Sequence, residues 1–145
     1  MNDAQLAAHL ADTAGRILLM LRGSAVFEGK ALGAAGDATA NQFIVHALRN
    51  LRPDDGILSE ESTDTKDRLD RDRVWIIDPV DGTREYGEAR ADWAVHVGLA
   101  VEGAATVGAV ALPGLEGGLV LRSDRPTART TRNGSPRLVV SRTRP

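Results

Sequence analysis

Hydrophobic residues recur at helical spacing along the first part of the chain. Residues 3–22 predict an amphipathic helix, because leucine and isoleucine return every three or four positions. Asn2 is expected to cap its start and Gly23 to end it. The buried stripe of this helix is expected to contain Leu6, Leu10, Ile17, Leu18 and Leu21.

A second helix is predicted over residues 39–51. Thr39 and Gln42 have the spacing of a capping box, and an apolar stripe follows them. The glycine- and alanine-rich residues 29–36 have little capacity for packing and are expected to connect the two helices.

Beyond the second helix, short apolar runs alternate with turn residues, which is typical of strands. Residues 74–77 are apolar at consecutive positions, which indicates a strand in the interior of its sheet. The charged residues 62–72 are expected to form a loop or an irregular helix. The dipeptides Glu102-Gly103 and Pro113-Gly114 predict turns between the last strands. The predicted strands are 57–58, 74–77, 93–101, 105–112 and 118–122.

This order of elements predicts an α+β fold. We expect a layered α/β sandwich with a mixed, largely antiparallel sheet and two N-terminal helices. Residues 1–122 form the expected domain, and residues 123–136, rich in arginine, threonine, serine and proline, read as a linker. Residues 137–145 contain a new apolar run at 138–141 and are expected to open a C-terminal domain that is missing.

Composition and charge limit the classes of protein and of binding site to which this chain can belong. The chain has 145 residues and no cysteine, which excludes disulfides and thiolate metal sites and favours a cytoplasmic location. No segment has the pattern of a membrane span or a signal peptide. Residues 122–145 carry seven arginines against Asp124 alone. Without interleaved aromatic residues, this basic tail favours a solvated or partner-facing segment over a nucleic-acid site.

Two carboxylates follow the strand at 74–77, in the run Asp78-Pro79-Val80-Asp81-Gly82-Thr83. Pro79 prevents ladder pairing at that point, and Gly82 permits a backbone turn that exposes N–H groups to an anion. Two nearby carboxylates stay ionised at low cost only when a cation lies between them, and Mg²⁺ prefers such oxygen ligands. The alternative is an ordinary turn, since Asp-Pro and Asp-Gly are common turn dipeptides.

The spacing of the two aspartates also bears on mechanism. Two residues separate Asp78 from Asp81, whereas one residue separates the aspartates of haloacid dehalogenases. This difference favours metal-activated water over an aspartyl-phosphate intermediate.

A second acidic run, Ser59-Glu60-Glu61-Ser62, follows the strand at 57–58. Alone, it would be interpreted as a solvated turn. If the two strands are neighbours in one sheet, however, Glu60 lies beside Asp78 and supplies a third carboxylate. A site for a pair of divalent ions is then expected at this edge.

The two acidic runs, in this order and separation, resemble the lithium-sensitive, Mg²⁺-dependent phosphatases of the inositol monophosphatase superfamily. The residues Gly82–Tyr86 are more similar to its 3′(2′),5′-bisphosphate nucleotidase branch. The resemblance covers the N-terminal half of such proteins. It implies a phosphomonoesterase that converts a small phosphorylated metabolite, 3′-phosphoadenosine 5′-phosphate above all, to the 5′-monophosphate. The alternatives are an inositol monophosphatase and a non-catalytic module that binds metal or dimerises.

The resemblance also implies roles for individual residues. Glu60, Asp78 and the Val80 carbonyl would bind one Mg²⁺, while Asp78 and Asp81 would bind a second, out of two or three ions in the complete enzyme. The substrate phosphate would lie against Asp81 and the backbone N–H groups of Gly82 and Thr83, and the Thr83 hydroxyl would orient the attacking water. Expected partners are a small-molecule phosphate substrate, and a second copy or a missing C-terminal half.

One departure from the family pattern concerns the aspartate that partners the threonine in a proton relay. In the segment Ala38-Thr39-Ala40-Asn41, Asn41 stands where that aspartate belongs. Asp37 is the candidate replacement, and the alternative for it is a charge placed before the helix start. A second departure is the absence of the family's Trp-Asp motif, which lies in the C-terminal half. The three histidines, His9, His46 and His96, are expected to be structural or solvated.

Overall fold

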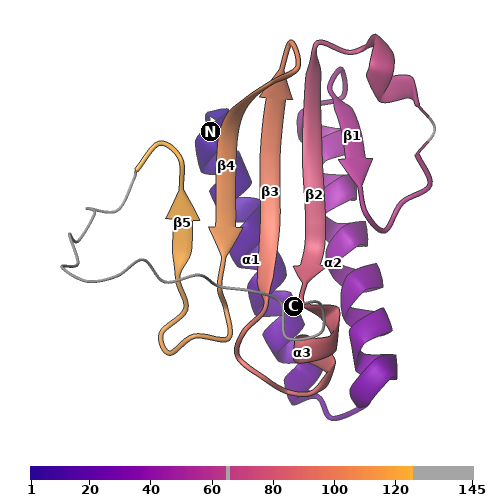
Figure 1. The fold of residues 1–145 in the computed structure, drawn as a ribbon, viewed down its shortest axis with the longest axis vertical. Coiled ribbons are helices and arrows are strands. Elements are labelled where there is room, and N and C mark those ends of the chain that lie inside the picture. The colour runs from indigo at the N-terminus through magenta and orange to yellow at the C-terminus, as the bar shows by residue number, and fades with distance from the viewer. Residues whose placement is uncertain (65, 126–145) are drawn as a thin grey trace, which may run out of the picture.

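Two long helices cover one face of a five-stranded sheet (Figure 1). The computed structural model describes residues 1–64 and 66–125. The helices are α1 (Asp3–Gly23) and α2 (Gly29–Leu51), and the strand order follows the sequence. β1 and β2 are parallel, and the other neighbouring strands are antiparallel. The strands are β1 (Gly56–Ser59), β2 (Arg73–Asp81), β3 (Ala94–Val101), β4 (Ala104–Ala111) and β5 (Val120–Arg122).

The first helix confirms the sequence prediction closely. The Asn2 side chain accepts a hydrogen bond from the Gln5 backbone N–H at 2.8 Å, and the Gln5 side chain accepts one from the Asn2 N–H at 3.0 Å. This reciprocal pair satisfies two N–H groups that the helix itself leaves unpaired. The helix ends at Gly23. Leu6, Leu10 and Leu18 of its predicted stripe are buried in the core, whereas Ile17 and Leu21 are only partly buried.

The predicted start of the second helix is wrong. Helix α2 begins at Gly29, so residues 29–36 are helical and Thr39 lies inside the helix, where its hydroxyl donates to the Ala35 carbonyl at 2.6 Å. Tertiary packing explains the extension. A Cβ on Gly33 would come within 2.9 Å of the Thr83 methyl carbon, and one on Gly36 within 2.5 Å of the Tyr86 ring. The two glycines therefore allow close contact between α2 and the segment after β2, and this packing outweighs the low helix propensity of glycine.

The five predicted strands are confirmed, and β2 is longer than expected because it continues through the acidic run. It lies between β1 and β3, as an interior strand should. Its two faces differ, however. Trp75 and Ile77 are buried under the helices, whereas Ile76 on the other face is 47% exposed. The apolar residues at consecutive positions therefore indicate an interior strand, but one face of β2 is left open in the described part of the chain.

Two short helices complete the described part. A 3-10 helix, η1 (Asp67–Asp70), lies in the charged connection between β1 and β2, which agrees with the expected irregular helix. Helix α3 (Thr83–Gly87) follows β2 directly and was not predicted. Its Tyr86 is buried against Trp93, with the two ring centroids 5.0 Å apart.

Some sequence predictions lie outside the described residues. They are the linker beyond residue 125 and the run at 138–141. Within the ranges described, no helix has both the length and the apolar character that crossing a membrane requires.

Candidate active site

The carboxyl ends of the parallel strands β1 and β2 bring the two acidic runs together. Ser59 pairs with Ile77 in the register, and the Glu60 backbone N–H donates to the Ile77 carbonyl at 3.2 Å. Glu60 therefore leaves β1 beside Asp78. The expectation that neighbouring strands place these two residues together is confirmed.

A bulge in β2 determines where the second aspartate points. Asp78 pairs with His96 and Asp81 pairs with Ala94, so three steps along β2 match two steps along β3. In a regular strand, residues three apart point to opposite faces. The extra residue of a bulge changes this alternation. Pro79 and Val80 are both buried, and Asp81 emerges on the open face next to Asp78 and His96.

The electrostatics of this edge are those of uncompensated negative charge. Burial raises the pKa of the Asp78 carboxyl to about 6, and the charges of Glu60 and Asp81 add to the rise. The charge of His96 and, after it, a hydrogen bond from the Val80 backbone N–H lower this pKa to a smaller extent. A carboxylate among carboxylates is stabilised by a cation, and the edge therefore favours one.

The segment after Asp81 turns sharply into α3. Gly82 has φ 90°, a conformation that favours glycine, and the helix begins at Thr83. The Thr83 hydroxyl lies 3.1 Å from the Val80 carbonyl oxygen and 3.3 Å from Asp37 Oδ1, so its one proton can be donated to either. The turn thus joins the acidic run to helix α2.

The structure decides between Asp37 and Asn41 as the neighbour of the threonine. Asp37 lies inside α2, is 8% exposed and contacts Thr83, so its interpretation as a charge before the helix start is wrong. Burial raises the pKa of the Asp37 carboxyl to about 6, and the Glu61 charge adds to this effect, while the hydrogen bond from Thr83 opposes it.

Asn41 lies one helical turn further and has a different set of contacts. Its Oδ1 accepts a hydrogen bond from the Ser59 hydroxyl at 2.7 Å, and its Nδ2 donates to the Ser62 hydroxyl at 3.0 Å. The two serines flank the pair of glutamates. Asn41 therefore ties the Glu60 turn to α2, and Asp37, the candidate replacement, is the residue of the two that is hydrogen-bonded to Thr83.

One contact at this edge was not anticipated. His96 Nε2 lies 3.1 Å from Asp81 Oδ2, although the histidine was expected to have no part in the site. The signal was weak in the sequence because the pair is fifteen positions apart and meets only through the β2–β3 register. His9 and His46 are exposed on the helices, as expected.

The donor set fits Mg²⁺ in its chemistry. Glu60, Asp78, Asp81 and the Val80 carbonyl present hard oxygen ligands, which this ion prefers. Across residues 1–64 and 66–125, no three acidic or histidine side chains are already arranged closely enough to enclose an ion by themselves. Water and substrate oxygens commonly complete such sites. The residues present therefore fit an open ion site better than a closed protein cage.

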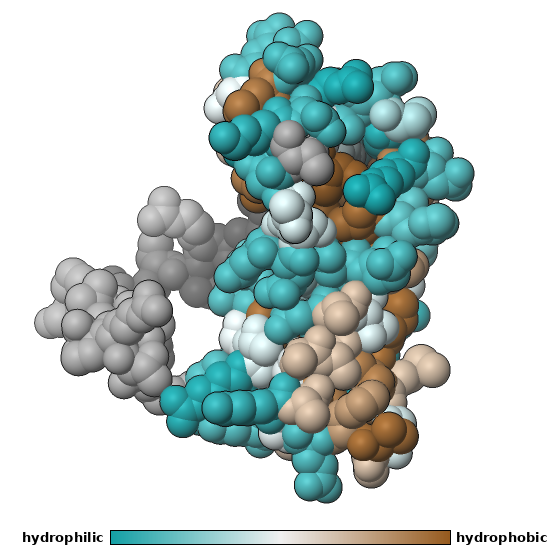
Figure 2. Space-filling model, turned by 90° about the vertical axis from the view of Figure 1, so that its right-hand side faces the viewer, coloured by the Kyte–Doolittle hydropathy of each residue, from teal (hydrophilic) through white to brown (hydrophobic). Residues whose placement is uncertain are grey.

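A groove of about 760 Å³ adjoins the threonine, between α2 and α3. Figure 2 shows the side of the molecule that carries β1, η1 and α2, where hydrophilic residues surround a hydrophobic patch in the upper part and apolar residues gather at the lower right. The groove has the volume of a small-molecule site. Its walls include Lys30, Asp37, Thr83 and Arg84.

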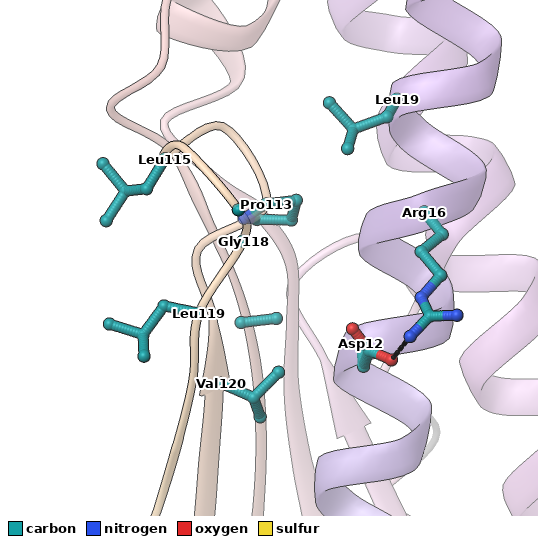
Figure 3. Close-up of a pocket in the computed structure, with 10 residues that line it drawn as sticks. Asp12, Arg16, Leu19, Pro113, Leu115, Gly118, Leu119 and Val120 are labelled. Atoms are coloured by element: carbon teal, nitrogen blue, oxygen red, sulfur yellow. Dashed lines mark ion pairs between the residues drawn. The ribbon is translucent and has the colours of Figure 1, made fainter. Parts of the chain in front are cut away.

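A different cavity, of about 520 Å³, lies between α1 and the β4–β5 loop (Figure 3). An ion pair between Asp12 and Arg16 lies on one wall, and Pro113, Leu115 and Leu119 lie on the other. No residue of the acidic edge lines it. This cavity is therefore separate from the candidate site at the carboxyl ends of β1 and β2.

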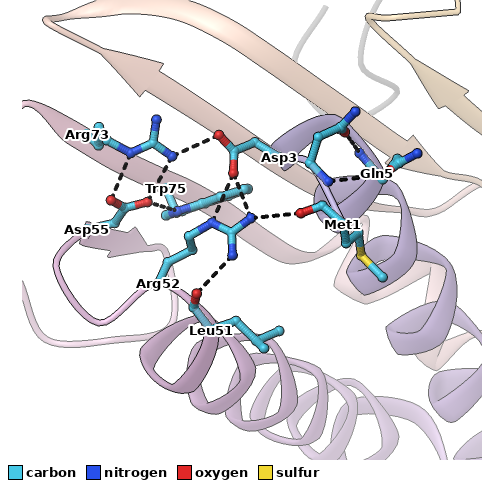
Figure 4. A network of polar contacts seen from close by, with 9 residues as sticks. Met1, Asp3, Gln5, Leu51, Arg52, Asp55, Arg73 and Trp75 are labelled. Atoms are coloured by element: carbon cyan, nitrogen blue, oxygen red, sulfur yellow. Dashed lines mark hydrogen bonds and ion pairs between the residues drawn. The ribbon is translucent and has the colours of Figure 1, made fainter.

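A second acidic cluster lies at the opposite end of β2 (Figure 4). Asp55, which precedes β1, accepts hydrogen bonds from Arg73 Nε at 2.9 Å and from Trp75 Nε1 at 2.7 Å. Asp3 accepts from Arg73 at 2.9 Å and from Arg52 at 3.0 Å. Each of these aspartates has a guanidinium partner, and the cluster joins α1, the end of α2 and the sheet.

Comparison with known proteins adds three findings. Residues 4–139 match the model of the inositol monophosphatase family. A Mycobacterium leprae protein named 3′-phosphoadenosine 5′-phosphate phosphatase is 48% identical, and the match covers 100% of this chain and 58% of that protein. A Mycobacterium bovis protein of the same name is 45% identical, and the match covers 91% of this chain and 53% of that protein. A Thermotoga maritima IMPase structure superposes with a TM-score of 0.70 at 25% identity, over 92% of this chain and 55% of that one. The chain spans a little over half the length of the curated relatives it matches.

Proposed function

This chain belongs to the inositol monophosphatase family, and from that premise we propose that it forms the metal- and phosphate-binding part of a Mg²⁺-dependent phosphomonoesterase. The proposed substrate is a 3′(2′),5′-bisphosphate nucleotide, with 3′-phosphoadenosine 5′-phosphate converted to the 5′-monophosphate. The names of the relatives from Mycobacterium leprae and Mycobacterium bovis support this choice over an inositol phosphate.

The observation that carries the proposal is the convergence of three carboxylates at one sheet edge. Glu60 comes from β1, and Asp78 and Asp81 come from the bulged end of β2. The raised pKa of Asp78 reflects burial and the negative charges around it, which a cation would offset. A stability role would instead call for arginine or lysine partners, as at the other end of β2.

Each residue has a proposed part. Glu60, Asp78 and the Val80 carbonyl would hold one Mg²⁺, and Asp78 with Asp81 would hold a second. Bound there, Mg²⁺ would lower the pKa of a water and offset charge on phosphate oxygens. The backbone N–H groups of Gly82 and Thr83 would hold the phosphate, because the turn at Gly82 leaves the first N–H groups of α3 without helical partners.

Thr83 and Asp37 would move the proton. The Thr83 hydroxyl accepts the proton of the attacking water and donates its own to Asp37, whose carboxylate lies 3.3 Å away. The phosphorus–oxygen bond to the leaving group breaks as the bond to the water oxygen forms, and the leaving 3′-oxygen takes a proton from solvent water to become a hydroxyl. No covalent enzyme intermediate is needed. Asp37, buried within α2, is held in reach of the hydroxyl by the helix.

The test is phosphate release by the 145-residue chain. We expect Mg²⁺-dependent release from 3′-phosphoadenosine 5′-phosphate that exceeds release from myo-inositol 1-phosphate. Thr83→Val removes the hydroxyl with little change of shape, so it should abolish turnover while calorimetry still detects Mg²⁺ binding. Thr39→Val, which removes an exposed hydroxyl elsewhere on α2, is the matched control and should retain both.

Three results would contradict the proposal in different ways. Absence of Mg²⁺ binding by the wild-type chain would remove the metal site itself. Binding of Mg²⁺ and nucleotide without turnover would favour the non-catalytic metal-binding module. Faster turnover of myo-inositol 1-phosphate than of 3′-phosphoadenosine 5′-phosphate would contradict the proposed substrate and leave the proposed mechanism unchanged.

A further inference from the structure

We propose that His96 is a positioning residue that holds the Asp81 carboxylate toward the second ion. This inference rests on the proposed function, because it assigns Asp81 to a metal site. It adds a residue to which the family resemblance gave no role and which the sequence pattern suggested was merely solvated or structural.

The bulge in β2 makes such a support necessary. Asp78 is held by the regular β2–β3 ladder, in register with His96. Asp81 follows the two buried residues Pro79 and Val80, and its side chain is 61% exposed. An exposed side chain on an irregular backbone samples several rotamers, and fixing one of them costs entropy when a ligand binds.

His96 lies where it can supply that constraint. It faces the bulge from the neighbouring strand, and its Nε2 is 3.1 Å from Asp81 Oδ2. The imidazole donates from Nε2 to this oxygen, and Oδ1 remains available to an ion. Because the ring is short and attached to the regular strand β3, it holds the carboxylate with few internal degrees of freedom.

The same histidine contacts both parts of the acidic edge through the sheet. It is the direct cross-strand partner of Asp78 and the hydrogen-bond partner of Asp81. A hydrogen-bond donor at position 96 therefore orients Asp81, which is proposed to bind one ion, relative to Asp78, which is proposed to bridge two. Removal of such supporting partners typically costs about 10–100-fold in metal affinity.

The test uses three substitutions that separate the position of the donor from the presence of a side chain. In His96→Gln the amide nitrogen lies near the position of Nε2, in His96→Asn it lies near Nδ1, and His96→Leu has no donor. Calorimetric titration of the chain with Mg²⁺ should show affinity for the second ion reduced about tenfold by Asn and Leu and kept within about twofold by Gln. His46→Leu, on the exposed side of α2, is the control and should change nothing.

A second readout needs no metal. Three-bond couplings that report the χ1 angle of Asp81 should show one rotamer in the metal-free wild type and in His96→Gln. They should show averaging in His96→Asn and His96→Leu. This measurement stays informative even where a variant is less stable than the wild type, because it is made on the folded population.

The outcomes separate this inference from the proposed function. Any of three results would overturn the positioning role. The first is that His96→Leu binds two ions with wild-type affinity, and the second is that His96→Gln loses as much affinity for the second ion as His96→Leu does. The third is an averaged Asp81 rotamer in the metal-free wild type. Failure of the wild-type chain to bind Mg²⁺ at all would instead overturn the proposed metal site.

Discussion

The two ends of strand β2 carry acidic clusters with opposite electrostatic character. At the amino end, arginines partner Asp3 and Asp55, and the Trp75 indole donates to Asp55 (Figure 4). At the carboxyl end, carboxylates meet other carboxylates, and the pKa of Asp78 rises to about 6 through burial first and then through Glu60 and Asp81. Acidic residues alone therefore do not indicate a site. What distinguishes the carboxyl end is that, among the described residues, its carboxylates pair with no arginine or lysine, and Asp81 contacts a histidine instead.

The difference follows from which ends of the strands meet. Because β1 and β2 are parallel, the residues before them lie together and so do the residues after them. Asp55 and Arg73 are neighbours at the first edge, and Glu60 and Asp78 are neighbours at the second. The first edge stabilises the fold, and the second is available to a ligand.

The largest expected effect on stability is at the amino end. Asp55→Asn removes the charge that faces Arg73 and weakens the acceptor of the buried Trp75 indole, so the free energy of unfolding should fall by about 2–3 kcal/mol. Urea denaturation followed by tryptophan fluorescence measures this change. Asp54→Asn, an exposed neighbour, is the control and should be near neutral. A fall of similar size in the control would mean that the contacts of Asp55 are not what matters.

The corresponding change at the carboxyl end should have the opposite sign. Asp78→Asn removes a partly buried carboxylate that faces Glu60 and Asp81, so the metal-free chain should become more stable at neutral pH, by about 1 kcal/mol after allowance for solvent screening. The same denaturation experiment, with a chelator present, measures this gain. A loss as large as that of Asp55→Asn would make the two ends equivalent and refute the comparison.

The smallest effect concerns acid pH. The pKa of Asp3 is lowered, since hydrogen bonds from Arg73 and Arg52 outweigh the rise that burial causes. A carboxyl with a lowered pKa in the folded state adds stability above its unfolded pKa, near 3.8, and loses it as pH falls through the folded pKa. Asp3→Asn should therefore destabilise the chain at neutral pH by less than about 1 kcal/mol and flatten the acid limb of the stability profile. An unchanged acid limb would show that Asp3 does not contribute to it.

The sequence predicted the residues of the carboxyl end better than their geometry. The order of Glu60, Asp78 and Asp81 predicted three carboxylates at one edge on the condition that the two strands are neighbours. The parallel pair β1–β2 meets that condition. The bulge was not predictable in detail, since Pro79 indicated a break in pairing without showing to which face Asp81 would turn. His96 was missed for the same reason, because only the register brings it to Asp81.

Helix α2 shows a different limit of the sequence prediction. The capping box at Thr39 is a local signal, and it predicted a start ten residues too late. The early start depends on the contact of Gly33 with Thr83, which joins segments fifty positions apart. Once the helix extends over Asp37, that residue faces Thr83, and Asn41, one turn later, faces the serines beside Glu60. Tertiary packing therefore determines that Asp37, and not Asn41, faces Thr83.

The most direct test of the difference between the two ends is the response of the unfolding midpoint to Mg²⁺. A ligand that binds only the folded chain raises its free energy of unfolding by RT ln(1 + [L]/Kd), so the rise grows with the ligand concentration relative to Kd. Millimolar Mg²⁺ should raise the thermal midpoint of the wild type, and should raise that of Asp55→Asn by the same amount from a lower start. It should leave the midpoint of Asp78→Asn unchanged. An equal rise in Asp78→Asn, or no rise in the wild type, would contradict the assignment of the carboxyl end of β2 as a cation site.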